Sequence, residues 1–119
     1  MREMAAPQVV RLDASPSFAM VEGIIGRPLH GEKVTMNLAE MEPGSRVPEH
    51  EHPHEQLGVL LYGAVRMIIG GVEHELGPMD AYVVPSGVRH GAVCGPVRSA
   101  MLDVFAPPRD DYRTSSERT

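Results

Sequence analysis

The sequence predicts an all-β domain, built as a barrel or sandwich of short strands, and three observations lead to this class. Segments rich in apolar and β-branched residues are separated by turn residues about every 8–12 positions. The chain contains 12 glycines and 11 prolines, which are spread along it rather than gathered in one linker. No segment carries apolar residues at helical spacing over a useful length. Many short strands of this kind close into a barrel or pack as two sheets.

The chain length suits a single domain, because 119 residues can enclose one hydrophobic core. We expect an N-terminal arm over residues 1–17, the barrel over residues 18–109 and a flexible polar tail over residues 110–119. A sheet of this type has to cover its edges, and pairing of an arm or strand with a second subunit is one common way. The sequence therefore predicts a homodimer.

The expected strands follow from alternating or continuous apolar patterns that end at glycine or proline. They cover residues 18–25, 34–41, 56–62, 65–69, 72–76, 81–84, 91–94 and 98–105. Gly70-Gly71 joins two of these strands and predicts a tight hairpin, since both turn positions require positive φ. Residues 26–33 are expected to form a loop.

Composition argues against nucleic-acid and membrane partners. The formal net charge is −5, the sequence pI is near 5.6 and only 4% of residues are aromatic, which gives neither a basic footprint nor a stacking platform. No apolar run approaches the length of about 18 residues that a membrane span needs. The first residues do not resemble a signal peptide, and Cys94 is the single cysteine, so we expect a cytoplasmic protein without disulfides.

A histidine-rich segment, HEHPHEQ, is the strongest chemical signal in the chain. On an extended strand His50 and His52 point to the same face, and Gln56 has the same parity. Imidazole is the commonest protein ligand for first-row divalent metals, so the spacing suggests half of a metal site. His54 has that parity too, but it follows Pro53 and is left out of the ligand set. The spacing by itself is equally compatible with a polar loop that happens to contain histidines.

Two motifs in order resemble those of the cupin family. In the first motif, a glycine and a His-x-His pair precede Gln56 and a second glycine follows it. In the second motif, a proline, a glycine and a histidine follow one another at the family spacing. The matching residues are Gly44, His50, His52, Gln56, Gly63, Pro85, Gly87 and His90. Met79 and Cys94 depart from the second motif, where the family has glycine and asparagine. The resemblance implies a cupin jelly-roll barrel, also called a double-stranded β-helix, with one metal bound by His50, His52, Gln56 and His90.

Gln56 stands where the family pattern has glutamate. Three neutral imidazoles and a neutral amide oxygen leave the charge of a divalent cation uncompensated, which strengthens its Lewis acidity and its attraction for an anionic ligand. This favours non-redox chemistry on a small anionic substrate. Nickel, zinc, iron and manganese all accept such a ligand set, so the sequence does not identify the metal.

The segment MLDVFAPPRDDY adds a second group of candidates. Asp103 and Phe105 share strand parity with Met101, and Arg109 follows two prolines just beyond the strand. A buried carboxylate can move protons, and an arginine can hold a substrate carboxylate with two hydrogen bonds. A structural ion pair between Asp103 and Arg109 explains the same residues without catalysis. Tyr62, at the end of the strand over residues 56–62, is a further candidate for substrate binding.

The histidine segment followed by Asp-x-Phe-x-x-x-Arg resembles the small cupins of pectin and alginate degradation, which convert cyclic 4,5-unsaturated uronates to linear keto acids. That resemblance implies Asp103 as the acid or base, Phe105 as part of the pocket wall and Arg109 as the carboxylate-binding residue. Small polyketide cyclases with the same ligand set are the main alternative. A cupin dioxygenase and a non-catalytic metabolite-binding cupin are further alternatives.

Overall fold

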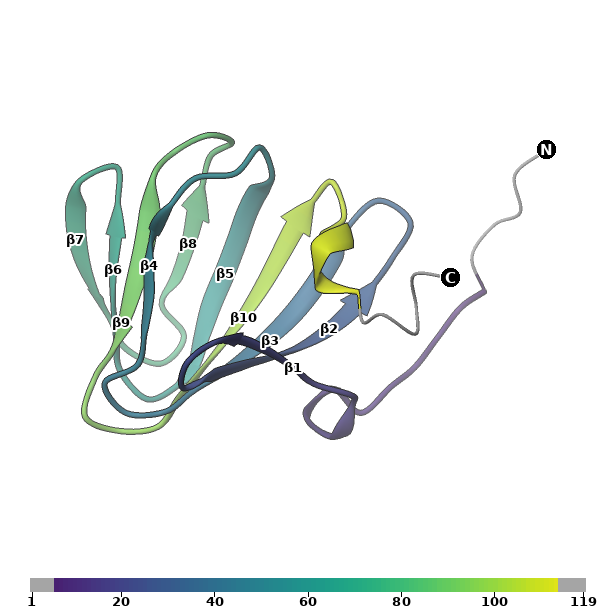
Figure 1. The fold of residues 1–119 in the computed structure, drawn as a ribbon, viewed down its shortest axis with the longest axis horizontal. Helices are drawn as coiled ribbons and strands as arrows, with labels where there is room; N and C mark the ends of the chain where they lie inside the picture. Colours follow the sequence, from purple (N-terminus) through teal and green to yellow (C-terminus); the bar gives the residue numbers. More distant parts are fainter. Residues whose placement is uncertain (1–5, 114–119) are drawn as a thin grey trace.

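The computed structural model describes residues 6–113, which form ten strands and two short 3₁₀ helices (Figure 1). The strands are β1 (Phe18–Val21), β2 (Ile24–His30), β3 (Thr35–Met41), β4 (Arg46–His50), β5 (Glu55–Tyr62), β6 (Val65–Ile69), β7 (Val72–Leu76), β8 (Ala81–Val84), β9 (His90–Cys94) and β10 (Ser99–Ala106). The helices are η1 (Leu12–Ala14) and η2 (Asp110–Tyr112). In the part of the chain described, no helix is long and apolar enough to cross a membrane.

Two antiparallel sheets face each other and enclose the core. The larger sheet has the order β1-β2-β3-β10-β5-β8, and the smaller has the order β4-β9-β6-β7. Several neighbours in these orders, such as β3 and β10 or β4 and β9, are far apart in sequence, as in a jelly roll, and the predicted all-β barrel class is confirmed. The core contains residues of both sheets, among them Leu60 and Val84 from the larger and Val65 and Met67 from the smaller. Each is at most 2% exposed, so the two sheets are held together by apolar packing.

The hairpin between β6 and β7 has the predicted turn. Gly70 and Gly71 have φ values of +57° and +82°, which other residues adopt with strain. The turn sets the register in which Ile69 pairs with Val72.

The N-terminal half of the barrel differs from the expected elements. The expected strand over residues 18–25 is two strands, and the expected loop after it is largely β2, which includes Pro28. β1 pairs with β2 only as far as Gly26, so β2 has an unpaired side at Pro28, where the missing N–H is tolerated. The expectation of a loop was therefore wrong, because a proline at an unpaired strand side removes no ladder hydrogen bond.

β3 turns polar side chains, not only apolar ones, toward the interior. Thr35 and Asn37 are fully buried, whereas Val34 is 42% exposed. Thr35 Oγ1 accepts a hydrogen bond from the main-chain N–H of Arg109 over 2.9 Å and lies 2.9 Å from His30 Nδ1. These contacts satisfy the buried hydroxyl and attach the segment after β10 to β3.

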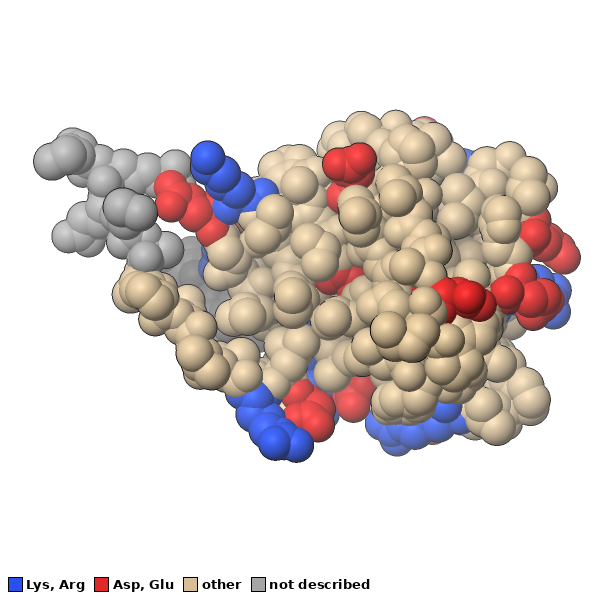
Figure 2. All heavy atoms as spheres, turned by 180° about the vertical axis from the view of Figure 1, so that it is seen from behind, with Lys and Arg blue, Asp and Glu red and all other residues tan. Residues whose placement is uncertain are grey.

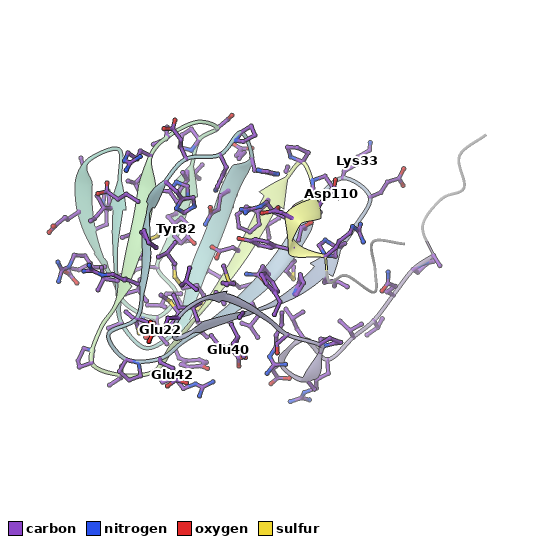
Figure 3. The ribbon with its side chains drawn as sticks, viewed as in Figure 1. Glu22, Lys33, Glu40, Glu42, Tyr82 and Asp110 are labelled. Atoms are coloured by element: carbon purple, nitrogen blue, oxygen red, sulfur yellow. The ribbon has the colours of Figure 1, made fainter. Side chains whose placement is uncertain are left out.

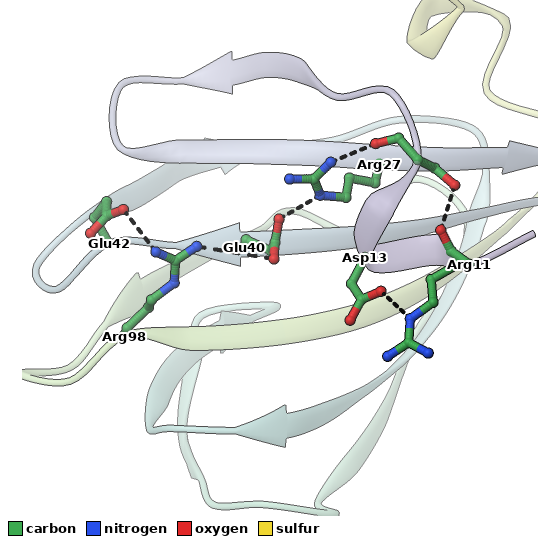
Figure 4. Close-up of polar contacts among 7 residues, drawn as sticks. Arg11, Asp13, Arg27, Glu40, Glu42 and Arg98 are labelled. Carbon is green, nitrogen blue, oxygen red and sulfur yellow. Dashed lines mark hydrogen bonds and ion pairs between the residues drawn. The ribbon is translucent and has the colours of Figure 1, made fainter.

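The arm is joined to the larger sheet by charged side chains (Figure 4). Arg27 donates to the Ser15 carbonyl and to Glu40, the latter over 2.7 Å. Arg98 lies 4.0 Å from the other carboxylate oxygen of Glu40 and 3.5 Å from Glu42. Because Arg27 and Glu40 are mostly buried, this chain of contacts holds the arm more firmly than separate surface pairs would.

The expected tail begins with an ordered turn. η2 places Tyr112 against Phe18 and Phe105, with ring centroids 4.9 and 5.6 Å apart, and Tyr112 is only 9% exposed. η2 therefore packs on the barrel, although it lies within the residues expected to form the tail. Residues 1–5 of the expected arm and 114–119 of the expected tail lie outside the described residues.

Candidate metal centre

The four predicted ligands meet at one end of the barrel, and they come from both sheets. His50 ends β4 and pairs with His90, the first residue of β9, in the smaller sheet. Gln56 lies on β5 of the larger sheet, and His52 lies in the connection between β4 and β5. The expectation that His50, His52 and Gln56 share one strand face is wrong, because the chain crosses between sheets after His50. The three side chains meet because the connection from β4 to β5 crosses from the smaller sheet to the larger one.

The donor atoms of these residues lie close enough to share one ion. One ring nitrogen from each of His50, His52 and His90 lies within 4.8 Å of the others. Gln56 Oε1 is 3.1 Å from His52 Nε2 and 3.1 Å from His90 Nε2. Two different sheets thus present three nitrogens and one amide oxygen to a common point.

Main-chain carbonyls set which nitrogen of each ring faces that point. The Nδ1 atoms of the three histidines lie 2.8 Å from Pro48 O, 3.0 Å from His54 O and 2.9 Å from Val88 O, respectively. A carbonyl can only accept, so each Nδ1 carries a hydrogen and Nε2 is the nitrogen that can turn a lone pair inward. Lone pairs facing one another at this distance repel unless a cation lies between them, and the donor set therefore fits a divalent metal ion.

Burial keeps two of the imidazoles, those of His52 and His90, in the form that binds metal. It lowers the pKa of His90 to about 4, and nearby His50, His52 and Arg109 act in the same direction. Burial also lowers the pKa of His52, with Arg109 as the next cause. Because a protonated imidazole has no lone pair on either nitrogen, these shifts keep both rings ready to coordinate at neutral pH.

The far end of the Gln56 side chain meets an acid and a phenol. Gln56 Nε2 donates to Asp103 Oδ1 over 3.3 Å and lies 3.5 Å from the Tyr82 hydroxyl. Tyr82 donates its own hydroxyl hydrogen to the same carboxylate oxygen. Tyr82 lies between the two sheets rather than on the surface (Figure 3). The amide thus connects the histidine cluster to the buried carboxylate.

Asp103 is suited to exchanging a proton near neutral pH. It is 6% exposed, and burial raises its pKa to about 6, against the opposing effects of the hydrogen bonds from Tyr82 and Gln56 and of the Arg109 charge. Burial and the neighbouring Asp103 raise the pKa of Tyr82 well above its ordinary value, so the phenol stays protonated.

Arg109 lies at the rim of the same cavity and is held on several sides. Its Nε and Nη2 donate to Asp111 over 2.9 and 2.7 Å. Its guanidinium carbon lies 4.8 Å from the ring centre of Phe105 and 4.0 Å from that of Tyr112. The bidentate ion pair of Arg109 is therefore with Asp111, and Asp103 bonds to Tyr82 and Gln56 instead.

Tyr62 is the one candidate that the structure does not bring to this site. Leu60 pairs with Met101 and Tyr62 with Ala100, so Leu61 is an extra residue that forms a bulge. The bulge reverses the strand parity, and Tyr62 lies on the outer face beside Leu38 and Leu102. Its assignment to substrate binding is corrected for this reason.

The sequence reasoning missed two site residues, Tyr82 and Tyr112. Tyr82 shares parity with buried Val84 on β8, which is a usable signal for an inward side chain. Tyr112 follows the two prolines, and no periodicity in the sequence indicates that the chain turns back there.

A cavity of about 60 Å³ joins these groups. Its polar wall contains His50, Gln56, His90 and Asp103, and its apolar wall contains four methionines, Met20, Met41, Met67 and Met101. A larger groove of about 500 Å³ shares His50, Arg109 and Tyr112 with the cavity. The site therefore opens past Arg109 and has an apolar floor.

Proteins of known identity match this chain in sequence and structure. The chain is 31% identical over 64 residues to the pectin degradation protein KdgF of Dickeya dadantii. This matched region covers 53% of this chain and 58% of that protein. It is 32% identical over 56 residues to the H2HPP isomerase of Bacillus subtilis, covering 46% of this chain and 24% of the isomerase. The chain thus matches well under two thirds of the length of either relative.

The structural match is more extensive. The solved structure of KdgF from a Halomonas species superimposes with a TM-score of 0.83 and 27% identity, covering 89% of this chain and 98% of that one. The family model described as "Cupin domain" matches residues 37–105, which contain both histidine motifs and the Asp103 strand. With its two sheets, its histidine cluster and this match over more than half its length, the chain belongs to the cupin family.

Proposed function

We propose that this cupin is a metal-dependent isomerase that opens the ring of a 4,5-unsaturated uronate to give the linear keto acid. One observation carries the proposal: a buried carboxylate with a raised pKa lies one hydrogen bond behind the amide that faces the histidine cluster, with an arginine at the cavity rim. The similarity to KdgF supports the uronate as substrate.

The residues have separate roles in the proposed reaction. His50, His52, Gln56 and His90 would hold one divalent transition-metal ion, which supplies Lewis acidity toward substrate oxygens. Asp103 accepts the proton of the hemiacetal hydroxyl as the ring C–O bond breaks. The resulting enolate takes up a proton at C4, returned by the protonated Asp103, and becomes the ketone, so no proton is gained or lost overall.

Arg109 would orient the substrate. Asp111 occupies its Nε–Nη2 edge, so a substrate carboxylate would approach the edge that carries Nη1. Phe105 and Tyr112 hold the guanidinium between them, which fixes its direction before substrate arrives.

A second candidate is supported by the apolar floor of the cavity. Four methionines give an adaptable surface that suits the apolar part of a polyketone better than a sugar acid. A polyketide cyclase would use the same metal site and Asp103 but would not require Arg109. If Arg109→Ala no longer converts the unsaturated uronate, the isomerase is favoured. If Arg109→Ala still converts a polyketone, the cyclase is favoured.

We also propose that the chain is a cytoplasmic homodimer that associates through the outer face of the larger sheet. Leu57, Tyr62 and Val83 on that face are 47%, 45% and 51% exposed. From behind, the side on which β5 and β8 lie, uncharged side chains cover most of the middle of the molecule, a few acidic side chains lie among them, and the basic side chains lie toward the margins (Figure 2). Val9 of the arm is 101% exposed, and in the dimer its side chain would pack against the apolar face of the partner subunit.

The first prediction concerns the metal. The purified protein should bind one zinc or nickel ion per chain, measured by elemental analysis after desalting. His90→Ala should lose this binding because it removes one of three imidazole ligands. His74→Ala, on the exposed face of β7, is the matched control and should bind like the wild type. Equal binding by the wild type and His90→Ala would contradict the assignment.

The second prediction concerns Asp103 and pH. Loss of the enol-ether absorbance of unsaturated galacturonate should give a kcat/KM that falls as pH drops through about 6, because protonated Asp103 no longer accepts a proton. Asp103→Asn should lower kcat by about 10²–10⁴-fold, the usual contribution of a general base. Asp80→Asn, in an exposed turn, should leave kcat unchanged. Full activity of Asp103→Asn would exclude this role.

The third prediction concerns assembly. Light scattering after size-exclusion chromatography should give the mass of two chains. Val83→Asp should give a monomer, because it places a charge on the proposed apolar interface. Val72→Asp, at a similarly exposed position on β7, should remain dimeric. A wild-type monomer at micromolar concentration would rule out the dimer.

A further inference from the structure

We propose that Tyr82 and Asp103 are positioning residues for Gln56, and that they decide which end of its amide faces the histidine cluster. This inference rests on the proposed metal centre but not on the identity of the substrate. It assigns a role to Tyr82, and it explains why glutamine rather than glutamate stands at position 56.

The two ends of an amide differ, because the oxygen accepts hydrogen bonds and the nitrogen donates them. In the structure the oxygen lies 3.1 Å from the Nε2 atoms of His52 and His90. The nitrogen lies 3.3 Å from Asp103 Oδ1. A rotated amide would set its oxygen against a carboxylate oxygen, which is unfavourable, and would turn toward the metal position its N–H groups, which have no lone pair to offer a cation. Asp103 therefore holds the Gln56 oxygen toward the metal position.

Tyr82 favours the same orientation of the Gln56 amide. Its single hydroxyl hydrogen is donated to Asp103 Oδ1, so the oxygen of the phenol presents only lone pairs to Gln56 Nε2 at 3.5 Å. Gln56 Nε2 thus meets two acceptors.

The sheet register brings this group together. Gly58 on β5 lies opposite Asp103 on β10 and opposite Tyr82 on β8, so the three form one row across neighbouring strands. A Cβ atom at Gly58 would overlap both the Tyr82 hydroxyl and Asp103 Oδ1. The absence of a side chain at position 58 creates the space in which the phenol and carboxylate meet behind Gln56.

The row also accounts for the residue type at position 56. A glutamate there would place a second carboxylate about one hydrogen bond away from Asp103, inside a buried site where like charges repel strongly. Glutamine avoids this repulsion and still offers an oxygen to the metal. The negative charge that a glutamate ligand would supply lies on Asp103 instead.

The experiment measures zinc affinity by isothermal titration calorimetry and the visible spectrum of the cobalt-substituted protein. Asp103→Leu removes the acceptor and should weaken zinc binding by about 10–100-fold, the usual effect of losing a residue that orients a ligand. Asp103→Asn keeps Oδ1 as an acceptor for both donors, so its zinc affinity and cobalt spectrum should match the wild type. Its turnover should still be lost, which separates positioning from proton transfer.

Tyr82→Phe tests the same role in a variant that keeps the ring. It should weaken zinc binding by about tenfold, whereas Tyr62→Phe, on the outer face, should have no effect and serves as the matched control. Circular dichroism and thermal unfolding establish that each variant is folded before titration.

The outcomes separate this inference from the proposed function. Wild-type affinity in Asp103→Leu, or an equal loss in Asp103→Asn and Asp103→Leu, would overturn the positioning role. The expected affinity pattern in a protein that does not turn over unsaturated uronates would support the positioning role and overturn only the substrate assignment.

Discussion

Three hydrogen bonds between imidazole Nδ1 atoms and main-chain carbonyls are the constraint on which the site depends. The carbonyls belong to the strand ends and turns that carry or flank His50, His52 and His90. The backbone therefore sets the tautomer and direction of each ring before any ligand binds. With the Nε2 atoms fixed in this way, the amide of Gln56 needs only the correct rotation to complete the set, and its contacts with Asp103 and Tyr82 supply it.

The barrel separates its polar and apolar interiors along its length. The metal-site end contains most of the buried polar side chains, including Gln56, His90 and Asp103, while Leu60, Val65 and Met101 fill the layer below. The ligands come from two sheets, so the apolar layer that joins those sheets also fixes the distances between ligands. Buried polar groups reduce the apolar surface available for folding, and this cost is concentrated where the proposed chemistry takes place.

Much of this arrangement could be predicted from the sequence, because the signals are local. The Gly70-Gly71 hairpin, most strand positions and the histidine spacing depend on neighbours within a few residues. Pairings between distant strands carry no such signal. Tyr82 reaches Asp103 only because β8 and β10 both border β5, and Tyr62 leaves the interior only because of the bulge at Leu61. Tyr112 packs on Phe18 of β1 and Phe105 of β10, two strands that are far from each other in the sequence.

The central claim is that four side chains bind one ion through the Nε2 atoms of three histidines and the Oε1 atom of Gln56. A crystal structure of the zinc-loaded protein, with anomalous diffraction data collected at the zinc edge, tests it most directly. We expect a single anomalous peak about 2.0–2.1 Å from each of the three Nε2 atoms, with Gln56 Oε1 also in the coordination sphere. A peak bound through Nδ1, a peak outside the cluster or no peak at all would contradict it.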